Sequence, residues 1–267
     1  MSVLQDRILG RAAELAFYFL FALFPTLFSA SSILGLVARS APQILDRLLA
    51  YLALLIPTAA LSTVLHTFNE TAAASTSGKV TFGLIASVWS ASVGISAIQD
   101  TLNDVYKIED ARSYLRSRLD AIGLTLLLTA IMALCLASLL GGDLLAALVL
   151  RLIPIHPLAA GAAIASRFMA WMFATFLLSL AFAVIYYAAP GFKEHRWHWI
   201  TPGASVGILG WLIASLVLRI YLHFFNSYSL TYGSLGAVII LLTWFYITGL
   251  MLLVGAEINR EIEAASL

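Results

Sequence analysis

Long apolar runs separated by short polar segments make up most of the chain. Six runs are close to 20 residues long, at about 17–37, 80–99, 120–140, 168–189, 202–222 and 234–255. About 20 apolar residues in a helix cross the hydrocarbon core of a bilayer, which is roughly 30 Å thick. Because the runs do not alternate with a period of two, they predict helices. We therefore expect an all-α integral membrane protein, with residues 1–267 forming one domain around six transmembrane helices.

A seventh apolar run, 48–65, is also long enough to cross, although Pro57 interrupts it. Positive charge favours cytoplasmic loops and separates the two possibilities. With six spans and a cytoplasmic N-terminus, nine Lys and Arg residues lie inside and six outside, whereas seven spans place the basic loop 107–118 outside. Six spans are favoured, with both termini cytoplasmic. Residues 43–70 then become an outer-side hairpin that is interfacial or re-entrant, and 144–157 predicts a second short outer-side helix.

One polar face runs along the second predicted span and beyond its end. At 100° per residue, Ser92, Ser96, Gln99, Asn103 and Tyr106 fall within an arc of about 80°. The helix enters from outside near residue 80, so after about 20 residues Gln99 lies near the inner boundary. The polar side chains therefore predict a cytoplasmic mouth rather than a site at the middle of the membrane.

The first and sixth predicted spans carry similar polar faces. Glu14, Tyr18 and Pro25 share one arc in the first span, and Thr243, Tyr246 and Glu257 share one in the sixth. Polar groups facing lipid are costly, so the three faces are expected to turn toward one another. Pro25 removes a backbone hydrogen bond and predicts a kink that shapes the bundle or acts as a hinge.

Two interpretations of these faces remain open. Serine, threonine and other small residues commonly serve as packing contacts between membrane helices, and this is the commoner case. Alternatively the faces line a cavity open to the cytoplasm, which ionisable groups near membrane depth favour. The candidates are Glu14, Asp100 and Glu257, each of which could instead be an interfacial carboxylate. Separately, the glycines of GASVGILG (203–210) predict close helix packing.

Composition supports a membrane location and gives little support to enzyme chemistry. The chain is 61% hydrophobic and 11% charged, its mean hydropathy is +0.96, and its net charge is +1, which does not suggest nucleic-acid binding. The single cysteine, Cys135, can form no intrachain disulfide. His195 and His198 lack the spacing of a helical zinc pair, and no phosphate-binding glycine loop or nucleophile motif is present. We expect no enzyme activity, no metal and no cofactor.

Several segments together resemble the YihY/BrkB family, which also carries the label ribonuclease BN. They are AFYFLFALFP (16–25), WSAS (89–92), LNDVYKIEDAR (102–112), YYAAPG (186–191), RWHWITPGA (196–204), YGSLGAVIILLTWFY (232–246) and LLVGAEINREIE (252–263). The resemblance covers nearly the whole chain and is most specific in the last two segments. It implies six transmembrane helices in the bacterial inner membrane, and some relatives are connected with the movement of envelope lipids.

A transport function uses most of these residues. The polar faces would line a cytoplasm-facing cavity, and membrane lipids, especially anionic ones, would be the partners. A basic collar around the cavity would attract anionic headgroups, at about 1 kcal/mol per base. The collar residues are Lys107, Arg112, Arg116, Arg118, Lys193 and Arg196. The alternative is a membrane protein that transports nothing and organises the envelope or binds a partner. A ribonuclease is disfavoured, because the inner loops lack a cluster of histidine and carboxylate groups.

Overall fold

A computed structural model describes residues 8–23, 50–51, 77–110, 112–153, 155–191, 201–224 and 234–265. Within these residues the secondary structure is helical, as expected. Residues 8–23 form the N-terminal helix, and residues 50–51 are also helical. The labelled helices are α4 (Ser77–Tyr106), α5 (Tyr114–Leu152), α6 (His156–Ala188), α7 (Pro202–Phe224) and α9 (Ser234–Ala265).

Four of the described helices, α5, α6, α7 and α9, are long and apolar enough to cross a membrane. They contain the predicted spans 120–140, 168–189, 202–222 and 234–255 almost entirely, which supports the membrane assignment. The predicted spans at 17–37 and 80–99 remain predictions. The N-terminal helix includes only the beginning of the first, and the outer-side segment 43–70 lies outside the described residues except for 50–51.

The predicted short outer helix at 144–157 is wrong. Helix α5 continues without interruption to Leu152, so 144–152 is its last part, and α6 begins at His156. The first residue that cannot continue the α5 helix is Pro154, which lacks a backbone N–H. At 39 residues, α5 is about 58 Å long, nearly twice the thickness of a hydrocarbon core.

Helices α5 and α6 form an antiparallel hairpin along a seam of small residues, which we call the α5–α6 seam. Gly142 is central to it, because an added Cβ would lie within 3.0 Å of the Ala170 side chain. Ser138 donates a hydrogen bond to the Ala170 carbonyl at 3.1 Å, and the Cys135 thiol lies 3.7 Å from the Ala174 carbonyl. Small side chains allow two backbones to approach closely where the surrounding solvent is lipid.

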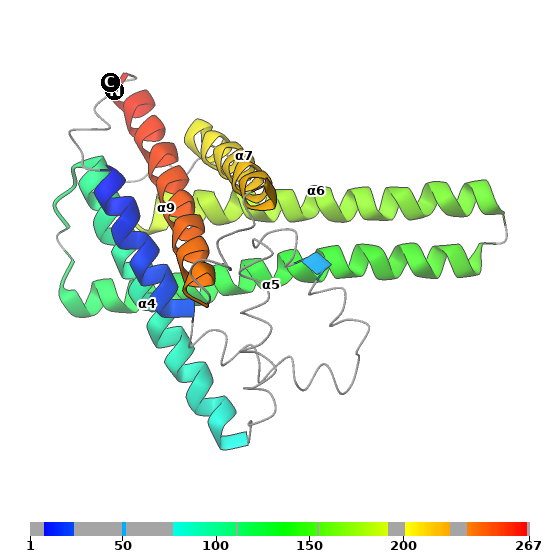
Figure 1. Ribbon diagram of the computed structural model, residues 1–267, viewed down its shortest axis with the longest axis horizontal. Helices are drawn as coiled ribbons and strands as arrows, with labels where there is room; N and C mark the ends of the chain where they lie inside the picture. The colour runs from blue at the N-terminus through cyan, green and yellow to red at the C-terminus, as the bar shows by residue number, and fades with distance from the viewer. Residues whose placement is uncertain are drawn as a thin grey trace.

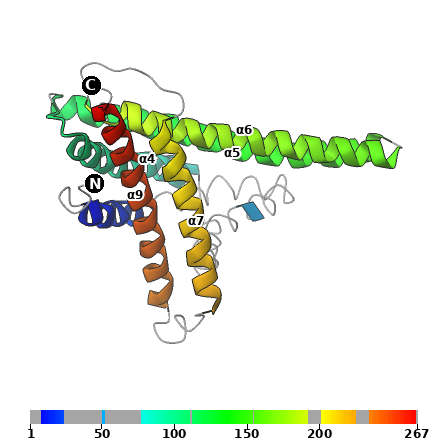
Figure 2. The ribbon, with the colours of Figure 1, turned by 90° about the horizontal axis from the view of Figure 1, so that it is seen from above.

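Helices α7 and α9 form a second antiparallel pair, and this pair runs crosswise to the α5–α6 hairpin (Figures 1 and 2). The predicted close packing of the glycines in 203–210 is confirmed. A Cβ on Gly203 would overlap the Gly255 carbonyl oxygen, and one on Gly207 would lie 3.2 Å from the Met251 carbonyl oxygen. At its far end the α5–α6 hairpin extends away from the other described helices.

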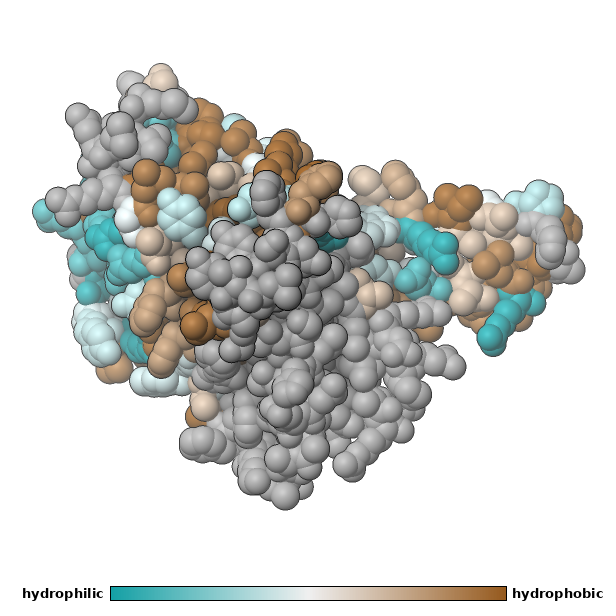
Figure 3. All heavy atoms as spheres, viewed as in Figure 1, coloured by the Kyte–Doolittle hydropathy of each residue, from teal (hydrophilic) through white to brown (hydrophobic). Residues whose placement is uncertain are grey.

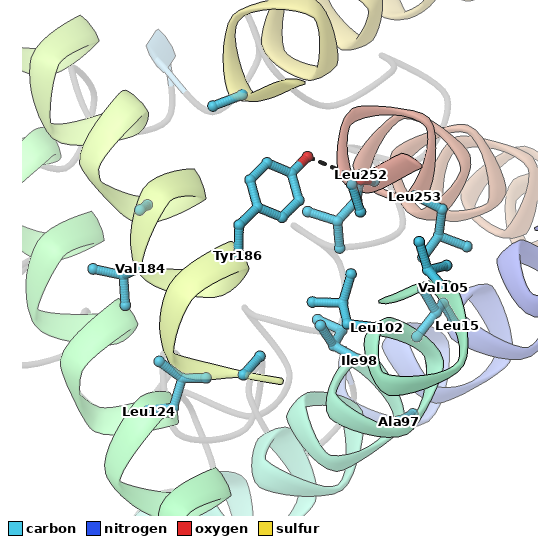
Figure 4. Packing of buried hydrophobic residues seen from close by; sticks show 14 of the residues in the cluster. Leu15, Ala97, Ile98, Leu102, Val105, Leu124, Val184, Tyr186, Leu252 and Leu253 are labelled. Carbon is cyan, nitrogen blue, oxygen red and sulfur yellow. Dashed lines mark hydrogen bonds between the residues drawn. The ribbon is translucent and has the colours of Figure 1, made fainter. Parts of the chain in front are cut away.

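Helix α4 lies between two sets of neighbours and is buried on opposite faces. On one face, Gly94 contacts Phe19 of the N-terminal helix, and Phe19 in turn packs edge-on against Phe245 of α9. Leu102 and Val105 join this apolar core together with Leu253 (Figure 4). The opposite face meets α5 and the end of α6, and it carries the polar side chains described below.

Candidate functional site

Four helices and one connection meet at a polar region that we call the helix junction. It comprises the end of α4 with residues 107–112, the end of α6 with residues 189–191, the start of α7, and the last turns of α9. Asn103 of α4 is buried within it and joins two of these parts. Its side-chain Oδ1 accepts a hydrogen bond from Gly191 N–H at 2.8 Å, and its side-chain Nδ2 donates to the Asp110 carboxylate at 3.2 Å. Asn103 therefore fixes the end of α6 against the end of α4.

Asn259 of α9 makes the corresponding connection to α7. Its side-chain Oδ1 accepts a hydrogen bond from the backbone N–H of Gly203 at 2.8 Å, and its side-chain Nδ2 donates to the Thr201 hydroxyl at 3.0 Å. Gly203 lies in the first turn of α7, whose N–H groups have no partner within the helix, so Asn259 caps α7 from a different helix. Tyr106 shares a hydrogen bond with Asn259, and burial raises the pKa of Tyr106 to about 12.

Tyr186 of α6 completes the junction by reaching α9. Its hydroxyl donates to the Leu252 carbonyl at 2.9 Å, as the dashed line in Figure 4 shows. Gly255 leaves room for this hydroxyl, because an added Cβ would lie within 3.0 Å of it. The family-like segments around residues 102–112, 186–191 and 252–263 thus converge on one structural feature.

Charged groups at the junction are mostly paired with one another. Arg11 of the N-terminal helix binds Glu14 at 2.7 Å and also Asp104 of α4. Arg260 donates to the Val105 carbonyl at 3.0 Å and binds Glu257, which is 4% exposed, at 2.7 Å. These contacts place the beginning of the N-terminal helix and the end of α9 at the same end of α4.

The connection after α4 is held by a charged pair between neighbours. Lys107 ends α4 in a left-handed conformation with φ 56°, and the chain then turns so that Arg112 binds Asp110 at 2.7 Å. Arg112 also donates to the Ala189 carbonyl at 3.2 Å and binds Asp120 at 3.3 Å. The Arg112 guanidinium holds the pKa of Asp110 below its ordinary value.

The α4 polar face, consisting of Ser92, Ser96, Gln99 and Asn103, is turned toward α5 and the end of α6. Arg118 of α5 donates to the Ser96 hydroxyl at 3.1 Å. Ser92 and Gln99 are 0% and 1% exposed. Neither amide atom of Gln99 has a hydrogen-bond partner in the described part of the protein. This direction differs from the prediction, in which the face was turned toward the first and sixth spans.

The other predicted pathway residues are divided between the core and the surface. Tyr18 and Tyr246 are partly buried and pack against the apolar core. Thr243 is exposed and donates a hydrogen bond to the Ile239 carbonyl of its own helix, and Asp100 is also exposed. The three predicted faces therefore do not form one shared lining, although the N-terminal helix, α4 and α9 do pack together. Pro25 lies outside the described residues.

The predicted basic collar is likewise divided. Arg112 and Arg118 are engaged by groups of the protein itself, whereas Lys107 and Arg116 are exposed. Arg118 also lies farther from the junction than predicted, because it contacts Ser96, which is about 10 Å along α4 from Asn103. Lys193 and Arg196 lie outside the described residues.

A second polar cluster, which the sequence analysis missed, lies on the α5–α6 hairpin. Asp143 binds Arg167 at 3.2 Å and accepts a hydrogen bond from the Tyr51 hydroxyl at 2.5 Å. Asp143 follows 22 residues without charge (121–142), and Arg167 precedes 21 more (168–188). Each interval is about 31–33 Å long, close to one hydrocarbon thickness. A lone aspartate after such a long uncharged run is the sequence pattern that could have identified the cluster.

Surface hydropathy separates the junction from the hairpin. Figure 3 shows hydrophilic residues gathered where the N-terminal helix and α4 meet the start of α5, whereas the α5–α6 hairpin is mostly hydrophobic with isolated hydrophilic positions. Near its tip, Leu148, Leu152 and Leu158 are each at least half exposed. The paired polar groups are therefore concentrated at one end of the described structure.

Comparison with known proteins supports the resemblance seen in the sequence. The family model described as virulence factor BrkB matches residues 2–267. The ribonuclease-like protein YfkH of Bacillus subtilis is 32% identical over 250 residues, which cover 94% of this chain and 88% of that protein. A UPF0761 membrane protein of Vibrio cholerae is 34% identical over 96 residues, or 36% of this chain and 31% of the relative. No solved structure matches the chain.

Proposed function

Because the chain belongs to the virulence factor BrkB family of membrane proteins, we propose that it moves an anionic lipid, or another envelope solute, across the bacterial inner membrane. The path would follow the α4 polar face where it meets α5. Both termini would be cytoplasmic. The contacts of Arg11 with Asp104 and of Arg260 with the Val105 carbonyl bring the N-terminal helix and the end of α9 to one end of α4, which supports placing both on the same side of the membrane.

The observation that carries the proposal is the buried amide of Gln99. A buried polar group without a hydrogen bond costs about 1–3 kcal/mol, so its presence in a native protein calls for an explanation, of which a functional role is one. Polar groups enclosed among membrane helices commonly mark the route of a substrate. From Ser92 to Gln99 the face extends about 10 Å, so it covers about a third of a hydrocarbon core before the predicted inner boundary.

In the proposed transport cycle, the contacts around this face would belong to the closed conformation. Arg118 bridges α5 to Ser96, and Asn103 joins Asp110 to Gly191, so both ends of the face are covered. Separation of α5 from α4 would expose Gln99 and the serine hydroxyls together. Asn103→Leu is a poor test of transport, because the substitution would also break the helix junction.

Substitution Gln99→Met tests the proposal by making two effects oppose each other. Methionine has a similar volume and no unpaired amide, so unfolding free energy should rise by about 1–3 kcal/mol. Transfer of fluorescent phosphatidylglycerol between the leaflets of proteoliposomes should slow toward the rate of empty liposomes. The matched control is Thr243→Val, on the exposed side of α9, which should leave transfer unchanged. Wild-type protein that does not accelerate transfer would reject the lipid version.

The second candidate is a membrane protein that binds a partner and transports nothing. The exposed leucines at the tip of the α5–α6 hairpin favour it, because large exposed apolar patches commonly mark interaction sites. This function would be favoured by two results together: Gln99→Met raises the free energy of unfolding, and neither wild type nor the variant transfers lipid faster than empty liposomes.

The ribonuclease-like name of the Bacillus relative is not carried over to this chain. Nucleic-acid binding needs bases that are presented to phosphates. In the described part of the chain, Arg11, Arg112 and Arg260 are instead paired with carboxylates. The residues thus support a structural role for these bases better than a basic binding surface.

A further inference from the structure

Arg118 differs from Arg112 and Arg260 in its partners. Arg112 and Arg260 each bind a carboxylate, whereas Arg118 is held by neutral groups. It donates to the Ser96 hydroxyl at 3.1 Å and to the Trp89 carbonyl at 3.2 Å, and its guanidinium carbon lies 4.4 Å from the centre of the Trp89 ring. Its positive charge therefore has no carboxylate partner among the described residues.

The Nε–H group of Arg118 is also buried without a hydrogen-bond partner in the described part of the chain. A guanidinium has five N–H donors, and burying one of them unpaired is unfavourable. The half-buried guanidinium is otherwise held by a hydroxyl, a carbonyl and an aromatic ring, none of which carries a negative charge. The arrangement is one that an anion would stabilise.

Gln99 provides an independent observation at the same interface. Its side chain is 1% exposed, and neither its Nε2 nor its Oε1 atom has a hydrogen-bond partner among the described residues. It follows Ser96 by three residues, so the two Cβ atoms lie on one side of α4, about 5–6 Å apart. The amide of Gln99 is therefore one helical turn from the hydroxyl that Arg118 binds.

We propose that Arg118 and Gln99 form a binding site for a phosphate group between α4 and α5. This inference rests on the proposed function and deepens it, because it assigns the chemistry of the substrate. Phosphate oxygens would accept from Arg118 Nε–H and from Gln99 Nε2–H. A hydroxyl next to the phosphate, such as the glycerol hydroxyl of a headgroup, would donate to Gln99 Oε1.

The planar guanidinium suits this ligand. Arginine binds phosphate through parallel N–H groups more specifically than lysine does, and charge-assisted hydrogen bonds are about twice as strong as neutral ones. Trp89 stacks on the guanidinium and is 58% exposed. The phosphate of a lipid would approach past this ring while its acyl chains remained in the membrane.

The test is calorimetric titration of the full chain, purified in a maltoside detergent and freed of lipid. The two probes are inorganic phosphate and dihexanoyl phosphatidylglycerol below its micelle concentration, with dihexanoylglycerol as the uncharged control. Arg118→Gln and Gln99→Met should each raise the Kd of the lipid about tenfold or more. Arg116→Gln, which removes an exposed charge two residues away, should change it by less than about twofold.

The two probes separate the sources of the phosphate. Saturable binding of both assigns the site to the phosphate group alone, and binding of the lipid only assigns it to a headgroup with its chains; either supports the site. Equal Kd values for wild type and Arg118→Gln would overturn it, as would binding of dihexanoylglycerol. Should Arg118→Gln fail to fold, Arg118→Lys keeps the charge, and an unchanged Kd there would overturn the site as well.

Failure of this site and failure of the proposed function are distinguishable. Loss of phosphate binding in Arg118→Gln or Arg118→Lys with normal leaflet transfer would remove the site from the transport path and leave the function standing. Normal phosphate binding by wild-type protein that does not accelerate transfer would keep the site and reject transport.

Discussion

At the helix junction, Asn103, Asn259 and Tyr186 join four helices through directed hydrogen bonds, whereas along the α5–α6 seam the helices meet through small residues such as Gly142. Directed bonds fix the angle and register of helices that cross. Small residues hold helices that run side by side over a long distance. The junction therefore positions helices whose axes differ in direction, and the seam holds two antiparallel helices side by side.

The difference also explains where the protein carries its charge. At the junction, arginines and carboxylates neutralise one another on helix ends and connections. Along the seam, the 22 residues before Asp143 and the 21 residues after Arg167 carry no charge, and these two residues pair with each other. Lipid can surround the helices of the α5–α6 seam at little cost, but at the helix junction it would leave polar groups without hydrogen-bond partners.

The largest expected effect comes from a methyl group placed in the seam. Gly142→Ala puts its Cβ within 3.0 Å of Ala170, so the helices must separate, which typically costs about 1–3 kcal/mol. The measurement is the free energy of unfolding in mixed detergent micelles. The control is the neighbouring Gly141→Ala, where no atom lies within 4 Å and alanine favours the helix. Equal losses in both variants would show that the seam is not tightly packed.

A smaller effect is expected at the junction from Asp110→Asn, and it should depend on pH. The Arg112 guanidinium lowers the pKa of Asp110, so its stabilisation is fully present above the unfolded value near 3.8 and is lost as pH falls through the folded pKa. Near neutral pH the variant should lose up to about 1 kcal/mol, as exposed ion pairs do.

The comparison of wild type with Asp110→Asn should therefore be made by measuring unfolding from pH 7 down to pH 3. The two stabilities should converge below about pH 3.8. Glu109→Gln, at the exposed neighbouring position, serves as the control for a general change in charge. A difference that stays constant over this range would contradict the assignment of the Asp110–Arg112 pair.

The smallest expected effect is that of one hydrogen bond between membrane helices. Ser138→Ala removes the bond to the Ala170 carbonyl, and such bonds average about 0.6 kcal/mol. Ser179→Ala is the comparison, because the half-buried Ser179 bonds to the Thr175 carbonyl of its own helix and so joins no second helix. A loss much above 1 kcal/mol would indicate that the seam depends on hydrogen bonding as the junction does.

Much of the fold could be predicted from the sequence, because apolar runs of membrane length specify helices almost directly. The runs at 202–222 and 234–255 lie within α7 and α9. The continuation of α5 through 144–152 could not be predicted, since a glycine pair such as Gly141 and Gly142 suggests that a helix ends there. Gly142 instead serves the approach of α6.

The candidate site was only partly predictable. Helical periodicity placed Ser96, Gln99 and Asn103 on one face, which the structure confirms. Periodicity could not identify the helix that this face packs against, because α4 is buried on two opposite faces. The opposite face packs against the N-terminal helix at Gly94, where an added Cβ would lie 3.7 Å from Phe19. Contacts such as that of Asn259 with Gly203 join residues 56 positions apart, and no local pattern specifies them.

The charged pair on the hairpin has a further consequence. Asp143 and Arg167 lie at one level, and the Asp110–Arg112–Asp120 group lies at the other end of the uncharged intervals. The distance between these two charged levels sets the bilayer thickness that the hairpin fits. A thicker bilayer would draw the ion pair into hydrocarbon, whereas a thinner one would expose leucine side chains to water. Growth conditions that change acyl-chain length should then destabilise this hairpin before they affect the helices of the junction.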